Sequence, residues 1–260
     1  MEDNQKATLT GAERINPYSD KGAKGDQVEQ MFDSIAPAYD FMNTAMTFGL
    51  HKSWRSRAIK HATRLLPKDK RLSILDLATG TGDLTFHLHT LFPSSDIQGI
   101  DLSEGMLDVA RHKLDSMPNN GKGGNISFYQ GDCLNLKNIN DNSQDLITIA
   151  YGVRNFEHLR KGLAEMARVL KPGGVICIIE LSQPRTPHLR MFYTLYSNHI
   201  IPFVGKMVSH DNRAYSYLPE SIAAAPQRSA LTSIMKECGF RNPEWRSMTF
   251  GSVTYYIATK

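Results

Sequence analysis

Short apolar runs alternate along residues 72–181 with stretches in which apolar residues recur at helical spacing. The strand-like runs cover residues 72–77, 96–102, 126–132, 145–152 and 175–181. The helix-like stretches cover residues 82–92, 103–114 and 158–170, and a helix pattern at 226–240 and a β-rich run at 252–259 follow. Strands that alternate with helices pair in parallel through right-handed crossovers, with helices on both faces. The alternation predicts a single α/β domain built on a doubly wound, mostly parallel sheet.

The segments outside this alternation predict the limits of the domain. Residues 1–25 are polar and lack apolar periodicity, so we expect a flexible leader there. Residues 26–66 carry apolar residues at helical spacing and predict a helical N-terminal cap, with bends at Pro37 and Gly49. Residues 184–222 break the alternation and predict a helical insertion after the fifth strand, on the substrate side. The single domain is then expected to span residues 26–260.

Composition and charge narrow the function classes. The net charge of +4 comes without a dense Lys/Arg stripe, which argues against a nucleic-acid surface. Three scattered cysteines without CxxC spacing indicate a reduced, cytoplasmic compartment and neither a disulfide scaffold nor a zinc site. No apolar run approaches the ~20 residues that span a bilayer. We therefore expect a cytoplasmic protein that meets a membrane, if at all, at its surface.

The stretch DLATGTGDL, which begins at Asp76, follows the first strand-like run. Ligands of open parallel sheets bind beyond the carboxyl ends of the strands, so this loop is the expected site. Gly80 and Gly82 allow the backbone to approach a ligand closely. The third glycine of a dinucleotide fingerprint is replaced by Thr85, and the Gly-Lys-Ser/Thr of a phosphate loop is absent. Asp76 and Asp83 would repel a pyrophosphate, so the loop favours a cationic ligand.

Two more carboxylates follow the next strands. Asp101 ends the second strand, where a carboxylate can accept both hydroxyls of a ribose. The alternative is an acid that only stabilises a helix N-terminus, with Ser103 as the cap. Asp132 ends the third strand and is placed to bond an adenine amino group, although aspartates are common in turns. Together these residues predict a nucleoside site.

This constellation resembles the class I S-adenosylmethionine-dependent methyltransferases, which have a seven-stranded Rossmann-like sheet. In that class the glycine loop lies under the methionine part of the cofactor and the two acids meet the ribose and the adenine. A ligand with a sulfonium, an ammonium and no phosphate also accounts for the missing third glycine. At position 150 some relatives carry a serine facing the cofactor, so we expect only backbone or packing contacts from Ala150. The resemblance implies these cofactor-binding residues: Asp76, Gly80, Thr81, Gly82, Asp101, Leu102, Asp132, Cys133 and Ala150.

Four further stretches resemble the C-methyltransferases of ubiquinone and menaquinone biosynthesis. They are YDFMNTAMTFGLHKSW from Tyr39, RVLKPGGVICIIELS from Arg168, YGVRNFEH from Tyr151 and AYSYLPESI from Ala214. The glycine loop and KPGG recur in many methyltransferases, whereas Tyr-Asp-x-Met-Asn and Gly-Val-Arg-Asn are more specific. Thr47 stands where that family usually has serine, so the hydroxyl is kept. The likeness runs from about Val28 to the end of the chain.

The resemblance implies methylation of a ring carbon of a prenylated quinol, most simply demethylmenaquinol, with a ubiquinone-branch benzoquinol as the alternative. The ring carbon becomes nucleophilic when an adjacent hydroxyl loses its proton, and alignment with the donor supplies much of the rate. Arg154 is the first catalytic candidate, to hold a phenolate or a water that takes the proton, and Asn155 is expected at the second ring oxygen. Arg154 could instead be a surface arginine in a loop. His199 and His210 are weaker candidates for a base.

The remaining predictions concern the acceptor side and the assembly. Tyr39, Asn43, Tyr215 and Tyr217 are expected to bind the substrate, although tyrosines two apart often only pack. The insertion is expected either to pack on the sheet or to line a groove for the isoprenoid tail and meet the membrane surface. We expect no metal and no nucleic acid, and a homodimer as the commonest assembly. Two other functions stay open, namely methylation of another small molecule and a non-catalytic S-adenosylmethionine-binding scaffold subunit.

Overall fold

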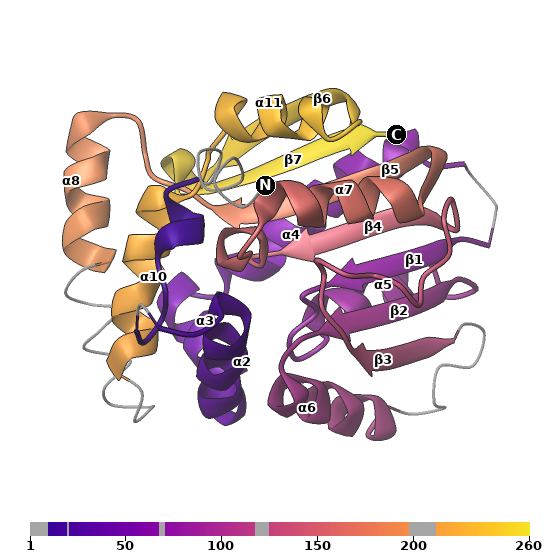
Figure 1. Cartoon of the computed structure of the whole chain (residues 1–260), viewed down its shortest axis with the longest axis horizontal. Helices are drawn as coiled ribbons and strands as arrows, with labels where there is room; N and C mark the ends of the chain where they lie inside the picture. Colours follow the sequence, from indigo (N-terminus) through magenta and orange to yellow (C-terminus); the bar gives the residue numbers. More distant parts are fainter. Residues whose placement is uncertain (1–9, 20, 68–70, 118–124, 198–211) are drawn as a thin grey trace.

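A computed structural model describes residues 10–19, 21–67, 71–117, 125–197 and 212–260, and its core is one seven-stranded sheet in the order β3-β2-β1-β4-β5-β7-β6 (Figure 1). The strands are β1 Ser73–Leu77, β2 Asp96–Asp101, β3 Ile126–Gln130, β4 Gln144–Ala150, β5 Leu170–Leu181, β6 Arg241–Met248 and β7 Val253–Thr259. β1 to β5 pair in parallel, and β7 runs antiparallel to both β5 and β6. This order confirms the predicted doubly wound, mostly parallel fold.

Helices cover both faces of the sheet. Those that follow strands are α5 Asp83–Leu91, α6 Glu104–Asp115, α7 Leu159–Val169 and α11 Ser229–Glu237. On one face α7 and α11 pack against the central strands, with Leu163 and Met235 fully buried. On the other face α5 packs beside α4 (Leu50–Ala62), with Leu88 and Ile59 fully buried. Because both faces are covered, β4 and β5 consist mostly of buried residues, as expected for parallel strands.

The cap and the insertion gather at the carboxyl ends of the parallel strands (Figure 1). The cap consists of α2 Lys24–Ile35, η2 Ala36–Ala38, α3 Tyr39–Thr47 and α4. The insertion contributes α8 Pro187–Leu195 and α10 Asn212–Ala224. The predicted bends lie in η2, which contains Pro37, and at Gly49, whose φ of 73° lets the chain turn between α3 and α4. The cap and the insertion therefore form the walls around the edge where ligands of such sheets bind.

The N-terminal segment differs from the predicted flexible leader. Residues 12–14 form a short 3₁₀ helix, and buried Lys24 donates from Nζ to the carbonyl oxygen of Ala12 at 2.6 Å. The Glu13 carboxylate accepts a hydrogen bond from the backbone N–H of Leu159 at 2.7 Å, which satisfies a free donor at the start of α7. Polar contacts therefore hold residues 10–19 and 21–25 against the rest of the domain. Residues 1–9 and 20 lie outside the described residues.

One edge strand gave no clear signal in the sequence. β6 has the sequence RNPEWRSM, contains a proline and lies at the edge of the sheet, where most of its residues are exposed or half-buried. Strand β5 also begins earlier than the apolar run at 175, because Leu170 already pairs with Gln144 before a register shift. Both differences lie away from the carboxyl edge of the sheet, so they leave the expected place of the site unchanged.

Candidate active site

The glycine loop joins β1 to α5 and takes a left-handed backbone at three positions. The φ angles are 48° at Ala78, 58° at Gly80 and 79° at Gly82. A Cβ at Gly82 would lie 2.9 Å from ring atoms of both Phe86 and Phe128, so this glycine permits close packing inside the protein. A Cβ at Gly80 would meet only Tyr39, at 3.9 Å. Gly80 is therefore the glycine whose backbone faces open space, whereas Gly82 faces the protein interior.

Asp76 supports this loop from below. Its carboxylate is buried and accepts hydrogen bonds from the hydroxyls of Thr148 at 2.6 Å, Thr85 at 2.8 Å and Thr79 at 2.9 Å. Burial raises the pKa of Asp76 and the three hydroxyls lower it. Thr85 stands where a dinucleotide-binding fingerprint has its third glycine, and here its hydroxyl donates to the buried Asp76. Hydrogen bonds from Thr79 and Thr85 to Asp76 hold the glycine loop, and with it Gly80, at the end of β1.

Asp101 at the end of β2 faces the same loop. One carboxylate oxygen accepts from the N–H of Gly80 at 2.7 Å and the other from the N–H of Ser103 at 2.9 Å. Burial raises the pKa of Asp101 to about 6, against the lowering effect of these bonds. Ser103 also caps α6 by accepting from the N–H of Met106. The N-cap residue of α6, Ser103, and a carboxylate that can bind a ligand, Asp101, therefore lie two residues apart.

A first cavity of about 220 Å³ opens at this edge of the sheet. Asp132 and Cys133 line it from the loop after β3, and Ala150 lines it from the end of β4. The predicted cofactor residues that line it are Gly80, Asp101, Leu102, Asp132, Cys133 and Ala150. Asp76 and Thr81 line a smaller polar cavity of about 40 Å³ over the glycine loop. The structure thus brings the predicted set together, with Gly82 as the residue that lines neither space.

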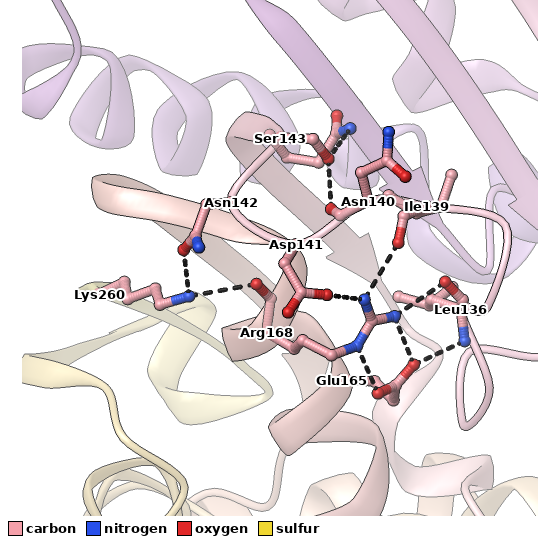
Figure 2. A network of polar contacts seen from close by, with 10 residues as sticks. Leu136, Ile139, Asn140, Asp141, Asn142, Ser143, Glu165, Arg168 and Lys260 are labelled. Atoms are coloured by element: carbon pink, nitrogen blue, oxygen red, sulfur yellow. Dashed lines mark hydrogen bonds and ion pairs between the residues drawn. The ribbon is translucent and has the colours of Figure 1, made fainter.

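A network of charged contacts holds the loop that carries Asp132 (Figure 2). The Arg168 guanidinium pairs with Glu165 at 2.8 Å and Asp141 at 2.5 Å, and donates to the carbonyl oxygens of Leu136 and Ile139. Arg168 is the first residue of the stretch RVLKPGGVICIIELS. These bonds join the chain between β3 and β4 to α7. The same connection carries Asp132 and Cys133, which line the first cavity.

A second, larger cavity of about 430 Å³ lies between the cap and the insertion. Its walls are mainly apolar and come from α2, α3, α4, α8 and α10. The predicted substrate residues Tyr39, Asn43 and Tyr217 line it, as does Arg154. Tyr217 is 2% exposed, its hydroxyl has no hydrogen-bond partner among the described residues, and Lys24 Nζ lies 5.9 Å from its ring centre. The cavity therefore combines an apolar interior with a few buried polar groups.

Three aromatic residues form the partition between the two cavities. Phe32, Tyr39 and Tyr151 line both, and the rings of Phe32 and Tyr39 meet edge to face with centroids 6.2 Å apart. Tyr151 holds its position with a φ of 62° and an N–H bond to the carbonyl oxygen of Ile179 at 2.7 Å. Such a backbone is costly for an aromatic residue and is typical of functional sites. The partition is therefore the place where ligands in the two cavities would meet.

Arg154 and Glu180 form a buried ion pair beside this partition. The Arg154 guanidinium lies 2.7 Å from the Glu180 carboxylate, which also accepts from the backbone N–H of Arg154 at 3.1 Å. Both side chains are nearly inaccessible, and Arg154 Nε has no partner among the described residues. Glu180 raises the pKa of Arg154 against the opposing effect of burial. Nη1 of Arg154 holds Glu180 and the carbonyl oxygen of Tyr151, whereas neither Nε nor Nη2 has a partner among the described residues, so the guanidinium is a fixed positive charge with donors left for a ligand.

Asn155, by contrast, lines the first cavity, so the neighbouring pair is divided between the two spaces. Its Nδ2 lies 3.4 Å from the carbonyl oxygen of Tyr151, and its buried Oδ1 has no partner among the described residues. The short turn 153–155 explains the division, because consecutive side chains of a 3₁₀ turn point about a third of a turn apart. This position favours a contact with the ligand of the first cavity over the predicted one with a substrate ring.

The cap is fastened to the glycine loop by charged groups. Asp40 accepts from the Thr81 hydroxyl at 2.5 Å and pairs with Lys113 at 2.5 Å. Lys113 also pairs with Asp83 at 2.8 Å, and Arg55 reaches Asp83 at 3.1 Å. Asp83, which we expected to face a ligand, is thus neutralised from two helices, and these contacts lower its pKa despite burial. Thr81 is bound to the cap rather than free.

His51 lines the second cavity and was missed in the sequence. It lies on α4, is 3% exposed and also lines the small polar cavity over the glycine loop. Its Nδ1 lies 2.7 Å from the hydroxyl of Thr47, the last residue of α3, across the turn between α3 and α4. Burial, helped by the positive charge of Arg55, lowers the pKa of His51 to about 4. Its place in the motif GLHKSW, four residues after Thr47, was the available signal.

Some predicted residues fall outside the description. His199 and His210 lie outside the described residues, and of Tyr215 only its place on α10 is described. The described residues contain no cluster of three His, Cys, Asp or Glu side chains that could hold a metal ion. No helix in the described ranges is both long and apolar enough to cross a bilayer.

Comparison with known proteins now identifies the family. A model of the ubiE/COQ5 methyltransferase family matches residues 20–260. The chain belongs to this family. A demethylmenaquinone methyltransferase of Bacteroides fragilis is 46% identical over 249 residues, which are 95% of this chain and 98% of that protein. One from Porphyromonas gingivalis is 40% identical over 253 residues, 97% of this chain and 100% of that protein.

The structural neighbours agree with the fold. Phosphoethanolamine N-methyltransferase 2 of Haemonchus contortus, solved with S-adenosylmethionine, aligns with a TM-score of 0.56 at 15% identity, covering 79% of this chain and 52% of that one. At that identity the likeness shows the fold alone. The family and the neighbours together point to S-adenosylmethionine as the methyl donor, which confirms the predicted cofactor. The chain is therefore an S-adenosylmethionine-dependent methyltransferase.

Proposed function

We propose that this methyltransferase transfers a methyl group to a ring carbon of a prenylated quinol, with demethylmenaquinol as the acceptor. The observation that carries the proposal is the second cavity, an apolar space of about 430 Å³ with the buried Arg154 guanidinium in its wall. An apolar lining suits an isoprenoid tail, and a fixed cation suits a ring oxygen that becomes negative. The names of the Bacteroides fragilis and Porphyromonas gingivalis relatives support this choice of acceptor.

The donor fits the first cavity and the polar space over the glycine loop. Asp101 offers a buried carboxylate to the ribose hydroxyls, and Asp132 and the unpartnered Oδ1 of Asn155 can accept from the adenine amino group. Asp76 supplies negative charge near the glycine loop for the ammonium of the methionine part, whereas Asp40 is already paired with Lys113. When bound, S-adenosylmethionine supplies an electrophilic methyl group on its sulfonium sulfur. Residues of both spaces therefore fit the donor without any phosphate contact.

The affinity for the donor should depend on pH through Asp101. Its pKa is raised to about 6, so protonation below that value removes an acceptor from the ribose. We expect S-adenosylhomocysteine to bind about ten-fold more weakly at pH 5 than at pH 7, as linkage to one group of that pKa gives. Titration calorimetry measures the change, and Asp101→Asn should bind weakly with no such slope. Equal affinity of the wild type at both pH values would contradict the assignment.

On the acceptor side Arg154 stabilises charge but cannot take up a proton. A guanidinium stays protonated at any physiological pH, and the adjacent Glu180 strengthens that preference. Arg154 lines the second cavity, and its unpartnered Nε–H and Nη2–H groups are the donors available to a ring oxygen as negative charge develops there. Asn43 and Tyr39 line the same cavity and can orient the ring. The proton of the quinol hydroxyl must therefore be accepted by another group.

His51 is the group whose hydrogen bonds leave a lone pair free. The Thr47 hydroxyl donates its one proton to the carbonyl oxygen of Asn43 at 2.6 Å, so its oxygen accepts from Nδ1–H of His51. The tautomer with hydrogen on Nδ1 leaves Nε2 as an acceptor. Among the described residues Nε2 of His51 has no hydrogen-bond partner. The lowered pKa keeps the ring neutral near pH 7. We assign His51 as the proton acceptor.

A histidine variant tests this assignment. We expect His51→Gln to lower kcat by about 10²- to 10³-fold at saturating donor, as loss of a general base does. Because the pKa of His51 is about 4, wild-type kcat at saturating substrates should stay flat from pH 7.5 down to pH 5.5. Steady-state kinetics across that range checks both points. Wild-type kcat in His51→Gln, or an acid limb near pH 6.5, would contradict the role.

The reaction itself is tested with labelled donor. Purified protein is mixed with methyl-labelled S-adenosylmethionine and, in parallel, a reduced demethylmenaquinol and a demethoxy-type benzoquinol with equally short tails. We expect label on a ring carbon of the naphthoquinol. Preference for the benzoquinol would move the protein to the ubiquinone branch. Donor binding without label in either ring would overturn the proposal and favour another small-molecule acceptor or a non-catalytic scaffold.

A further inference from the structure

Large apolar side chains are exposed around the mouth of the second cavity. The turn between α3 and α4, helix α8 and the turn between β6 and β7 carry Phe48, Leu50, Met191, Phe192, Leu195 and Phe250, which are 45–83% exposed. Phe48, Leu50 and Phe192 line the cavity itself, and Thr249 and Ser252 bring the β6–β7 turn to its edge. We call these three segments the rim. A set of this size on one side of a protein marks an interaction surface.

Two of the rim phenylalanines are held outward by an unusual backbone. Phe48 has a φ of 51° and is 83% exposed, and Phe250 has a φ of 57° and is 79% exposed. A left-handed backbone is unfavourable for a bulky residue, and glycine or asparagine would occupy it more easily. A hydrogen bond of 2.8 Å from Trp54 Nε1 to the Thr249 hydroxyl joins helix α4 to the β6–β7 turn. Phe48 lines the second cavity, and Thr249, which precedes Phe250, lines it as well.

The charge of the rim is one-sided. The stretches that contain it, residues 41–67, 181–197 and 245–260, include none of the chain's 26 acidic residues. Exposed Lys52, Arg57, Arg185 and Arg190 lie within the same stretches. Segments with exposed aromatic and aliphatic side chains, basic residues and no carboxylates are complementary to the surface of an anionic bilayer. A protein partner would not require the absence of acids over all three segments.

We infer that the rim docks the methyltransferase on an anionic lipid bilayer, with the mouth of the second cavity against the membrane. The inference rests on the proposed function, because the acceptor's tail resides in the lipid. Phe48 and Phe250 reach below the headgroups, and the basic residues contact lipid phosphates. A quinol ring then enters the cavity from the membrane while its tail stays in apolar surroundings throughout. Transfer through water of a long isoprenoid chain is thereby avoided.

Vesicle flotation of the full chain tests the inference. The probe is vesicles of 70% phosphatidylcholine and 30% phosphatidylglycerol, with pure phosphatidylcholine as comparison. The variant is Phe250→Asn with Leu195→Gln, since neither residue lines the cavity and asparagine tolerates the left-handed backbone. The matched control, Tyr129→Asn with Leu91→Gln, removes exposed apolar side chains from β3 and α5. We expect wild type and control to float with anionic vesicles and the rim variant to lose at least about five-fold in bound fraction.

Turnover separates this inference from the proposed function. With a short-tailed, water-dispersed quinol all three proteins should have equal rates, whereas with long-tailed quinol in vesicles the rim variant should be several-fold slower. Wild type that stays unbound while methylating the short-tailed quinol overturns the docking alone. The docking is also overturned if the rim variant floats with anionic vesicles as well as the control does. It is overturned as well if sedimentation shows that the wild type is a dimer and the rim variant a monomer, because the rim would then be a dimer interface. Absence of turnover with any quinol overturns the proposed function, whatever the flotation shows.

Discussion

Arg154→Ala should lower kcat for quinol methylation by about 10³-fold while S-adenosylhomocysteine still binds. Removing a preorganised donor to a developing negative charge costs about 10²- to 10³-fold in catalysis, and here a full positive charge is lost as well. Arg154 lines the second cavity, so donor contacts in the first cavity are spared. Steady-state kinetics and calorimetry measure the two effects separately. Wild-type kcat in this variant would refute the role of Arg154.

This variant also removes one partner of a buried ion pair, which needs its own control. Glu180 would remain buried without its counter-charge, and breaking such a pair destabilises a protein by about 3–5 kcal/mol. The double variant Arg154→Met with Glu180→Gln removes both charges and keeps an acceptor for the backbone N–H of Arg154. We expect it to regain most of the thermal stability but none of the activity. Activity that returned with stability would show that Arg154 acts only through folding.

Asp101→Ala should weaken donor binding by at least about 100-fold. The carboxylate is expected to accept two ribose hydroxyls, and bonds to charged groups are worth about 1.5–3 kcal/mol each. The variant also leaves the N–H groups of Gly80 and Ser103 without their acceptor, which loosens the glycine loop. Calorimetric titration with S-adenosylhomocysteine measures the loss.

The matched control for this variant is Asp96→Ala at the other end of β2. Asp96 is paired with Arg71 at 2.5 Å on the surface, away from either cavity. We expect its donor affinity to equal that of the wild type, because surface pairs of this kind contribute little. Unchanged affinity in Asp101→Ala, with the control also unchanged, would remove Asp101 from the donor site.

The carboxyl edge of the sheet was predictable from the sequence because strand ends are marked by residue type. Asp101 and Asp132 follow apolar strands, and the parallel pairing brings both to the cavity that Gly80 also lines. Apolar periodicity located the strands, and the type of residue at each strand end located the site. β6 gave no such signal, since an exposed edge strand with a proline needs no alternation of apolar residues.

Buried polar contacts are what the sequence could not reveal. The sequence places Glu13 and Lys24 in the expected leader. In the structure Glu13 accepts from the backbone N–H of Leu159 at the start of α7, and buried Lys24 donates to the carbonyl oxygen of Ala12. The separation of Arg154 from Asn155 depends on the pitch of one short turn. His51 required knowledge of which way α4 faces, because a histidine among polar helix residues is usually exposed. Each of these depends on side-chain direction rather than on pattern.

The nine-residue helix α3 contacts both halves of the reaction. Tyr39 lines both the first and the second cavity, and Asn43 lines the second. Asp40 accepts a hydrogen bond from Thr81 of the glycine loop. Any ligand that shifts α3 in one cavity therefore changes the other. Thermodynamic linkage makes this effect reciprocal, so quinol and donor must alter each other's affinity by one and the same factor. One turn of helix, from Tyr39 to Asn43, is thus the part of the fold through which the two binding sites can be coupled.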